Sequence, residues 1–217
     1  MMSSFKNLTQ QYQKQYRLYG DSPASLLCPK GRQDLRFRAI DQFIDRDGLR
    51  ILDYGCGLGH LLGYLDRFGR IVEYFGYDIV DDFISACQAK HGTRGEFRKV
   101  EPESPITGNF DITFASGVFN VAVGEPSKYR NYTLQLIKNL FLISNDVLIC
   151  DFMSGYVDFR QSNAQHFTVA EISDFCAQHL SRRFIIRHDL RPYEFTLIAF
   201  KDDNISFPNS IFRVDER

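Results

Sequence analysis

The chain has 217 residues, of which 44% are hydrophobic and 24% are charged, a composition typical of a folded globular domain rather than of a disordered, collagen-like or coiled-coil chain. Its 26 basic and 27 acidic residues give a net charge of −1, which argues against nucleic acid as a partner. No apolar run approaches the roughly 20 residues that a membrane span needs, and the N-terminus is too polar for a secretory signal. We therefore predict a cytoplasmic protein without membrane association.

The cysteines and histidines do not follow a metal-site pattern. The five cysteines are widely spaced and never form a CxxC pair, so neither a disulfide framework nor a zinc site is expected. The five histidines are equally scattered and show no HExxH spacing. The sequence therefore predicts no bound metal.

The first part of the chain, residues 1–31, is polar and rich in Tyr and Gln. We predict a short helix followed by an irregular segment, because turn-favouring residues interrupt its second half, namely Gly20, Asp21, Pro23, Pro29 and Gly31. Apolar residues at helical spacing then predict a helix over residues 33–47, and Gly48 stands where a helix would end.

From residue 50 onward, short apolar strands alternate with helices. The predicted strands are residues 50–54, 72–79, 97–100, 110–116, 145–153, 183–190 and 194–201. The predicted helices are residues 59–68, 81–90, 127–144 and 168–180. The last helix begins with Thr168 and carries Glu171 three residues later, which is the signature of a capping box.

This alternation predicts a Rossmann-like, doubly wound α/β fold with a seven-stranded, mostly parallel sheet and helices on both faces. Only the tripeptide RPY separates the last two strands, which is too short for a parallel crossover, so these strands are expected to form an antiparallel hairpin. In such folds ligands bind beyond the carboxyl ends of the strands. The loops at those ends are therefore the predicted site.

A glycine-rich loop, DYGCGLG at residues 53–59, joins the first of these strands to the following helix. Glycines at alternate positions let the backbone turn tightly and approach a ligand without steric conflict from side chains. The helix behind the loop offers free N–H groups at its N-terminus. The alternative interpretation is a glycine-rich turn without a ligand.

Two classes of cofactor-binding protein use such a loop. The dinucleotide fingerprint GxGxxG needs a third small residue, but His60 or Leu62 occupies that position in the two possible registers. The pattern DxGxGxG instead resembles motif I of the class I S-adenosylmethionine-dependent methyltransferases. In that family the acidic residue at the position of Asp53 helps to hold the methionine part of the cofactor, and the glycines lie along the cofactor.

Further segments carry the same resemblance. Asp78 ends the second predicted strand, 19 residues after Gly59, where a carboxylate can accept hydrogen bonds from ribose hydroxyls. Residues 110–117, FDITFASG, resemble the fourth strand of the family. Glu101, or alternatively Glu103, follows the third strand, where the family often binds the adenine amino group. The resemblance covers residues 33–201.

The resemblance implies S-adenosyl-L-methionine as the cofactor and S-adenosyl-L-homocysteine as its product. The residues that it implies for cofactor binding are Asp53, Gly55, Cys56, Gly57, Gly59, Asp78, Ile79, Glu101, Ser116 and Gly117. A narrower similarity links residues 19–23, 114–120, 151–159 and 187–196 to a group of bacterial class I methyltransferase-like proteins. This narrower similarity gives no substrate.

A methyl acceptor must be positioned and often deprotonated, so polar residues at strand ends are the candidates for catalysis. His188, which Asp189 or Asp151 could orient, and Asp151 itself are the predicted catalytic residues. The alternative is that both make structural contacts only. The predicted substrate-binding residues are Tyr19, Asp21, Phe119, Asn120 and Tyr156.

Residues 1–31 are predicted to form a helix and lid over the mouth of the site, and an ordinary packing helix or a dimer contact is the alternative. The methyltransferase domain is predicted over residues 32–201, followed by a C-terminal tail over residues 202–217. Basic residues near the predicted lid could recognise a phosphate or carboxylate, although a solvated face is the more usual meaning of such charge; they are Arg17, Lys30, Arg32, Arg36 and Arg38.

The leading hypothesis is O- or N-methylation of a small molecule by a monomer or homodimer. A macromolecular acceptor is the second hypothesis, but the net charge and the SGVFN end of the fourth strand argue against nucleic acid. The third hypothesis is a non-catalytic S-adenosylmethionine-binding protein of the same fold. A nicotinamide oxidoreductase is the fourth, and His60 disfavours it.

Overall fold

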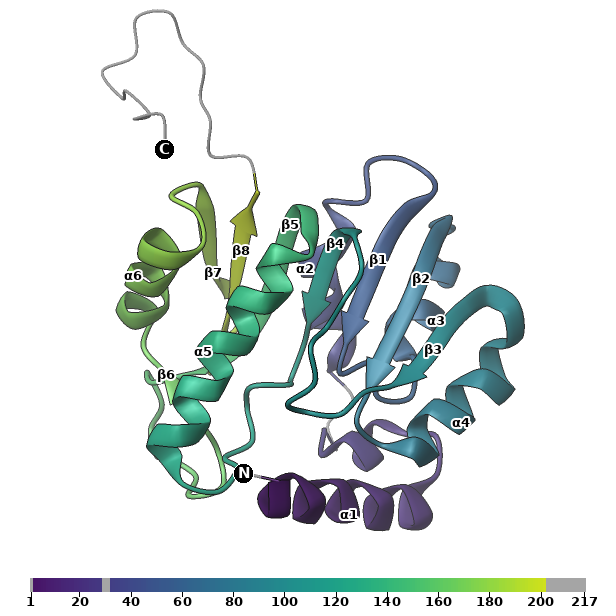
Figure 1. Cartoon of the computed structure of the whole chain (residues 1–217), viewed down its shortest axis with the longest axis horizontal. Helices are drawn as coiled ribbons and strands as arrows, with labels where there is room; N and C mark the ends of the chain where they lie inside the picture. The colour runs from purple at the N-terminus through teal and green to yellow at the C-terminus, as the bar shows by residue number, and fades with distance from the viewer. Residues whose placement is uncertain (1, 29–31, 202–217) are drawn as a thin grey trace, which may run out of the picture.

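The chain folds around a central eight-stranded sheet (Figure 1). The structure, a computed structural model, describes residues 2–28 and 32–201. Its helices are α1 (Met2–Tyr19), the 3₁₀ turn η1 (Pro23–Leu26), α2 (Gln33–Asp41), α3 (His60–Arg67), α4 (Asp81–His91), the 3₁₀ turn η2 (Gly92–Arg94), α5 (Pro126–Leu142) and α6 (Val169–His179). Its strands are β1 (Leu49–Tyr54), β2 (Val72–Asp78), β3 (Gly95–Lys99), β4 (Phe110–Ala115), β5 (Ser144–Ser154), β6 (His166–Phe167), β7 (Phe184–Arg191) and β8 (Glu194–Phe200).

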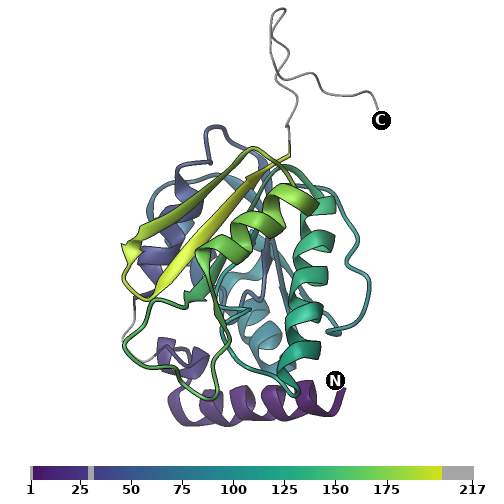
Figure 2. The same ribbon diagram turned by 90° about the vertical axis from the view of Figure 1, so that its left-hand side faces the viewer.

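The strand order is β3-β2-β1-β4-β5-β8-β7, with β6 paired to β5 beside this path. Strands β1 to β5 pair in parallel, whereas β8 lies between β5 and β7 and runs antiparallel to both. The predicted fold class is therefore confirmed, including the antiparallel hairpin (Figure 2). The short strand β6 was not predicted, because two residues carry too little periodic signal.

Two apolar clusters fill the two faces of the sheet. Helices α2, α3 and α4 cover one face and α5 and α6 cover the other. Successive residues of a strand point to opposite faces, so Ile51 and Leu52 of β1 belong to different clusters, as do Leu148 and Ile149 of β5. Both faces are thus buried, as expected for a parallel sheet with crossover helices. The carboxyl ends of the strands remain the place where a ligand can enter.

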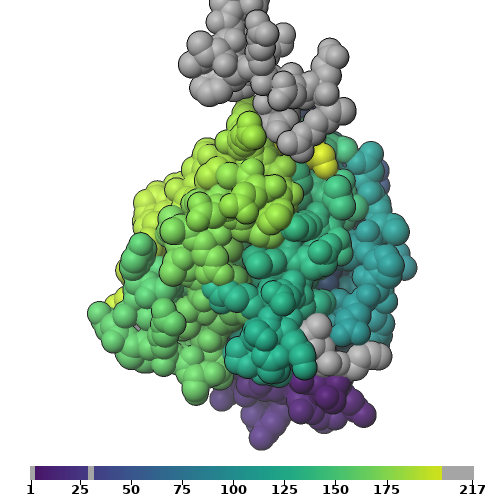
Figure 3. All heavy atoms as spheres, turned by 60° about the vertical axis from the view of Figure 1, so that its left-hand side comes forward, coloured from purple at the N-terminus to yellow at the C-terminus, as the bar shows by residue number. Residues whose placement is uncertain are grey.

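Helix α1 lies across these carboxyl ends and forms one end of the molecule (Figures 1 and 3). Phe5 packs edge-on against Tyr132 of α5, with ring centroids 5.1 Å apart. Further along the helix, Tyr12 packs edge-on against Phe83 of α4, with centroids 5.9 Å apart. These aromatic anchors at two places along α1 bridge α5 and α4 and hold the helix over the strand ends.

The boundaries of the first two helices differ from the predicted ones. Helix α1 runs to Tyr19 and is longer than the short helix that was predicted. Helix α2 ends at Asp41, although the apolar pattern extended to Ile44. Phe43 and Ile44 follow in a turn whose N–H groups bond to carbonyls three residues back, and Phe43 packs on Phe200. The predicted tail, residues 202–217, lies outside the described residues.

No helix within residues 2–28 and 32–201 has both the length and the apolarity needed to cross a membrane.

The N-terminus of α6 provides a test of the local structure. Thr168 Oγ1 accepts a hydrogen bond from the Glu171 N–H at 3.1 Å, but the Glu171 side chain pairs with Arg130 instead of completing the capping box. Thr168→Ala is expected to lower the free energy of unfolding by about 1 kcal/mol, the usual value of such a cap. Urea unfolding measures it, with Thr168→Ser as the matched control. An alanine variant as stable as the serine variant would contradict the assignment.

Candidate functional site

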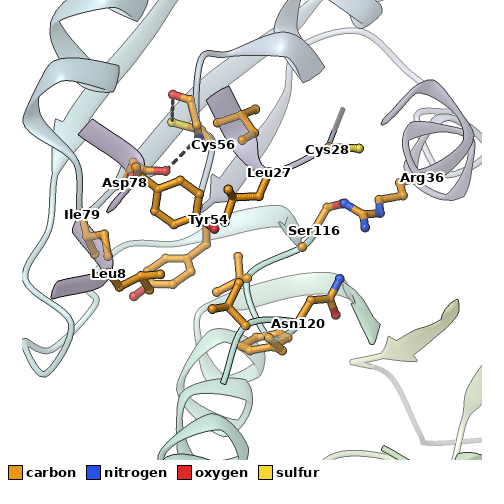
Figure 4. A pocket seen from close by; sticks show the side chains of 18 of the residues that line it. Leu8, Leu27, Cys28, Arg36, Tyr54, Cys56, Asp78, Ile79, Ser116 and Asn120 are labelled. Atoms are coloured by element: carbon orange, nitrogen blue, oxygen red, sulfur yellow. Dashed lines mark hydrogen bonds between the residues drawn. The ribbon is translucent and has the colours of Figure 1, made fainter. Parts of the chain in front are cut away.

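A cavity of about 490 Å³ opens at the carboxyl ends of β1, β2 and β4 (Figure 4). Its walls come from the loop after β1, the ends of β2 and β4, helices α1 to α5, the turn η1 and the β7–β8 turn. In Figure 4, Asp78 and Arg36 lie on opposite sides of the cavity, with Tyr54 and Leu27 between them. The cavity thus has an end lined by Asp53 and Asp78, called the acidic end, and an end lined by Arg36, Arg191 and Glu194, called the arginine end.

The glycine loop forms the floor of the acidic end. Gly55 and Gly57 have φ of 77° and 55°, in the left-handed region that favours glycine. A Cβ on Gly55 would stand 2.4 Å from Val118 Cγ2, and a Cβ on Gly57 would stand 2.8 Å from Leu26 Cδ2. The loop is therefore a cradle that has no room for a side chain at Gly55 or Gly57.

Asp78 clamps this loop to the end of β2. One of its carboxylate oxygens accepts a hydrogen bond from the Gly57 N–H at 2.9 Å, and the other accepts one from the Val80 N–H at 2.9 Å. Burial raises the pKa of Asp78 to about 6, and the backbone hydrogen bonds oppose that rise. Each oxygen keeps a further lone pair for a ligand hydroxyl.

Asp53 is the second buried carboxyl group of the acidic end. It is 4% exposed and accepts a hydrogen bond from the Tyr74 hydroxyl at 2.5 Å. Burial, with a contribution from the nearby Asp78, raises the pKa of Asp53 to about 7 in spite of that hydrogen bond. A bound cation, or a set of hydroxyl donors, would stabilise the ionised form of these two carboxyl groups.

At the arginine end, Glu194 joins two guanidinium groups. Arg36 donates two hydrogen bonds to its carboxylate, at 2.8 and 2.7 Å, and Arg191 donates one at 2.7 Å. Behind them, Asp151 accepts hydrogen bonds from Ser116 Oγ at 2.5 Å and from the Gly117 N–H at 2.7 Å. The Arg36 Nε lies 3.7 Å from Asp151. This network ties the loop after β4 to α2 and to the hairpin.

Aromatic and apolar side chains cover the cavity. They come from α1, η1, α4 and α5 and include Phe5, Leu8, Tyr12, Leu26, Leu27, Phe83, Tyr129 and Tyr132. Burial raises the pKa of Tyr12 and of Tyr54 to about 12, so both hydroxyls stay protonated at neutral pH. The cover is therefore uncharged, and the charged side chains discussed here lie at the acidic end and the arginine end.

Most of the predicted cofactor-binding residues line this one cavity. They are Asp53, Gly55, Cys56, Gly57, Asp78, Ile79, Ser116 and Gly117. Gly59 does not line it; it precedes α3, and a Cβ there would stand 2.8 Å from His91 Nε2. Glu101 is exposed and pairs with Lys99 at 3.2 Å, whereas its neighbours Val100 and Pro102 line the cavity.

The predicted substrate-binding residues are divided. Phe119 and Asn120 line the cavity. Tyr19 and Tyr156 are exposed outside it, Tyr156 by 66%. Asp21 also lies outside the lining, where it pairs with His60 at 2.9 Å and with Lys90 at 2.8 Å. Asp21 thus fixes the segment after α1 to α3 and α4.

Neither predicted catalytic residue lines the cavity. His188 lies within β7 and packs against Tyr156 and Phe195, with ring centroids 6.2 and 6.0 Å apart. The reason is that β7 continues to Arg191, so the turn at the cavity carries Arg191 and Glu194 instead. Asp151 is 3% exposed and holds the loop after β4 from behind. The assignment of a base to His188 or Asp151 gains no support from this placement.

Several residues of the cavity were not predicted. The aromatic residues Tyr129 and Tyr132 lie on α5, where their spacing predicts an ordinary core face. Arg191 and Met153 come from the ends of β7 and β5. Tyr54 lies inside the glycine motif itself, which is the one local signal that could have found it.

The residues present fit S-adenosylmethionine. The cofactor needs close backbone approach, acceptors for two ribose hydroxyls and a negative partner for its ammonium group. The side-chain-free cradle at Gly55 and Gly57 and the buried carboxyls of Asp53 and Asp78 supply these features in one cavity. Within the described ranges, no cluster of three or more His, Cys, Asp or Glu that could hold a metal is found.

Gly55 offers a test of the cradle. Gly55→Ala is expected to weaken binding of S-adenosyl-L-homocysteine at least tenfold, because the new methyl group must displace Val118, which lines the cavity. Gly69→Ala is the matched control, since Gly69 has a φ of 67° but no atom within 4 Å of a Cβ. Both variants carry the left-handed strain of about 1–2 kcal/mol. Equal affinities in calorimetric titrations of the two variants would contradict the cradle.

Comparison with known proteins identifies the family to which the chain belongs. The model of a family described as "Methyltransferase domain" matches residues 45–181. Rv1506c of Mycobacterium tuberculosis (strain ATCC 25618 / H37Rv), a protein provisionally named as a methyltransferase, is 25% identical over 158 residues, which cover 71% of this chain and 95% of that protein.

Solved structures share the fold. Magnesium protoporphyrin IX methyltransferase (ChlM) from Synechocystis PCC 6803, solved with bound S-adenosylhomocysteine, has a TM-score of 0.65 at 16% identity, covering 93% of this chain and 98% of that one. The pyocyanin biosynthetic protein PhzM has a TM-score of 0.63 at 15% identity, covering 88% of this chain and 62% of that one. The [4+2]-cyclase SpnF also matches, with a TM-score of 0.55 at 15% identity over 74% of this chain and 60% of that one. The same fold therefore carries more than one kind of reaction.

Proposed function

Because the chain belongs to the methyltransferase-domain family, whose model matches residues 45–181, we propose that it transfers the methyl group of S-adenosyl-L-methionine to an oxygen or nitrogen of a small molecule. The observation that carries the proposal is the acidic end of the cavity, where a glycine cradle and two buried carboxyl groups, Asp53 and Asp78, face the same space. The neighbours ChlM and PhzM, which belong to small-molecule chemistry by their names, support the acceptor class.

In this proposal the chain binds and orients the cofactor through the acidic end. The Asp78 carboxylate accepts the ribose hydroxyls, while the Gly57 and Val80 N–H groups hold that carboxylate in place. Asp53 is the partner of the cofactor's ammonium group, with Tyr74 fixing its orientation. When bound, the cofactor supplies an activated methyl group on its sulfonium centre.

Besides binding the cofactor, the chain aligns the acceptor with the methyl group and excludes water from the cavity. Transfer is an in-line displacement, so the acceptor atom must be held opposite the leaving sulfur. Asn120 and the loop at Ser116 and Gly117 lie on the acceptor side of the proposed cofactor site, and Asp151 fixes that loop. Apolar residues of α1, including Phe5, Leu8 and Tyr12, cover the cavity and keep water out.

We propose that residues 1–31 act as the lid and residues 32–201 as the catalytic domain. Helix α1 is attached through Phe5 and Tyr12, and the segment after it through the Asp21 pairs with His60 and Lys90. A lid held by a few side chains can open to admit ligands, whereas the sheet beneath it stays fixed. Cytoplasmic location and the oligomeric state, monomer or homodimer, remain predictions from the sequence.

The experiment that tests the function follows a labelled methyl group. The purified protein is incubated with methyl-labelled S-adenosyl-L-methionine and an extract of the source cells, and the products are separated by a size filter. Label in the low-mass fraction is the expected result, and mass spectrometry then identifies the acceptor. Label only in the high-mass fraction would contradict the proposal in favour of a macromolecular acceptor. Absence of label in both fractions, with the cofactor bound, would favour the non-catalytic alternative.

A further inference from the structure

The carboxylates at the arginine end are already occupied. Glu194 accepts two hydrogen bonds from Arg36 and one from Arg191, and both guanidinium groups bond to the same oxygen, Oε2. Asp151 accepts from Ser116 and Gly117 and lies beside Arg36. Neither carboxylate needs a further donor, so this end has little capacity to recognise a cation or a hydroxyl group.

The donors at the same end are not all occupied. Arg36 uses Nε and Nη2 on Glu194, while its Nη1 stands 3.0 Å from the place of a Cβ on Gly117, in the loop after β4. Arg191 uses only Nη1. Within residues 2–28 and 32–201, no acceptor bonds to Arg36 Nη1 or to the other two nitrogens of Arg191. Both side chains line the cavity.

Asn120 adds a donor of fixed orientation. Its Oδ1 accepts a hydrogen bond from the Met153 N–H at 2.9 Å, so the amide oxygen is turned toward β5 and the Nδ2 donor is left without a partner among the described residues. Met153 lies opposite Glu194 in the β5–β8 register. The amide of Asn120 is thus anchored on β5, and Asn120 lines the same cavity as Arg36, on the side away from Asp78 (Figure 4).

We propose that the methyl acceptor carries a carboxylate, and that Arg36, Arg191 and the Asn120 amide bind it at the arginine end. This inference rests on the proposed function and names its substrate class. Two guanidinium groups and an amide donor that line one cavity match the acceptor-only chemistry of a carboxylate. The uncharged aromatic cover suits the apolar body of such a molecule. A carboxylate bound here would lie across the cavity from Asp78 (Figure 4).

A free carboxylic acid and the carboxylate of the cofactor itself present the same chemistry, so the test must separate them. The probes are benzoate and 4-hydroxybenzoate, with benzamide and 4-hydroxybenzamide as neutral partners of matched shape. Binding is measured by saturation-transfer NMR on the full chain with saturating S-adenosyl-L-homocysteine, whose own affinity is measured by calorimetry. The expected result is that the acids bind at least tenfold more tightly than the amides.

Asn120→Asp is the decisive variant. It keeps an oxygen for the Met153 N–H but replaces the Nδ2 donor, which is unpaired among the described residues, by a second oxygen. We expect acid binding to fall about tenfold or more and affinity for S-adenosyl-L-homocysteine to stay unchanged. Arg191→Gln is the second variant, with the same expectation, because Glu194 keeps both hydrogen bonds from Arg36. Thermal unfolding of each variant verifies that it is folded.

The outcomes are distinct. Acids that bind no better than amides to the wild-type protein, or that do not bind at all, would overturn the proposed acceptor class. An equal loss of affinity for S-adenosyl-L-homocysteine in Asn120→Asp and Arg191→Gln would assign these donors to the cofactor and overturn it too. Failure of the wild-type protein to bind S-adenosyl-L-homocysteine would instead contradict the proposed function itself.

Discussion

Asp78→Ala is expected to weaken binding of S-adenosyl-L-homocysteine by about 1–3 kcal/mol, which is roughly 5-fold to 150-fold in Kd. In the proposed cofactor site, the variant removes the acceptor for the two ribose hydroxyls. It also leaves the Gly57 and Val80 N–H groups without their partner, so that the glycine cradle is released from the end of β2. Isothermal titration calorimetry at neutral pH measures the effect.

The control for Asp78→Ala is Asp34→Ala. Asp34 is a half-exposed carboxylate on α2 that pairs with Arg67 and does not line the cavity. It is expected to change stability by less than about 1 kcal/mol and to leave the affinity intact. An Asp78→Ala protein that is folded and binds S-adenosyl-L-homocysteine as tightly as the wild type would remove Asp78 from the site.

Cofactor affinity is expected to fall steeply between pH 8 and pH 5. Burial raises the pKa of Asp53 to about 7 and that of Asp78 to about 6. An ammonium group and ribose hydroxyls bind the ionised carboxylates, so protonation competes with the cofactor. For a required group with a pKa near 7, only about one hundredth is ionised at pH 5, which corresponds to a loss of about a hundredfold in affinity. Calorimetric titrations with S-adenosyl-L-homocysteine across this range measure it.

The stability of the free protein is expected to show the opposite trend. A carboxyl group whose pKa is raised by folding binds more protons in the folded state than in the unfolded state between about pH 4 and pH 7. Its contribution to stability is therefore fully present below the unfolded pKa and is lost as the pH rises through 6 and 7. Asp53→Asn should remove the part due to Asp53. Identical pH profiles of the unfolding midpoint in Asp53→Asn and wild type would contradict a raised pKa at Asp53.

The grouping of residues at the acidic end of the cavity could be predicted because its information is local. The residues from Asp53 to Gly57 form one strand–turn segment, and Asp78 is the last residue of the next strand. In a parallel sheet the ends of neighbouring strands must meet, so two local patterns are enough to bring these residues together. The register of β1 and β2, in which Asp53 lies opposite Gly76 and Tyr54 opposite Tyr77, is the consequence.

The arginine end could not be predicted in the same way because its contacts join distant parts of the chain. Arg36 and Glu194 are 158 residues apart, and only the packing of α2 on the hairpin brings them together. In the sequence Arg36 was one of five basic residues that could recognise a phosphate or carboxylate or form a solvated face, and nothing distinguished it from the other four. His188 was placed at the carboxyl end of its strand, whereas it lies three residues before the end of β7, where the register with β8 shifts between Arg187 and Arg191. The sequence pattern does not reveal such a shift, so it could not show which side chain of the hairpin reaches the cavity.

The aromatic cover of the cavity is a third part of the site that could not be predicted from the sequence. Tyr129 and Tyr132 occupy the spacing of a buried helix face, and residues of a core and of a cavity wall are both apolar and buried. Phe5 of α1 packs on both tyrosines, and all three side chains line the cavity. The fold class depends on periodicity alone and was predictable, whereas the division between core and cavity wall depends on where the helices finally pack.

The central claim is that the cavity at the carboxyl ends of β1, β2 and β4 holds the cofactor at its acidic end. A crystal structure of the protein with S-adenosyl-L-homocysteine tests it most directly. The account predicts ribose hydroxyls within hydrogen-bond distance of the Asp78 carboxylate, the cofactor backbone along Gly55 and Gly57, and its sulfur facing the loop at Ser116 and Gly117. A ligand bound elsewhere, or one that leaves Asp78 without a ligand contact, would contradict the account.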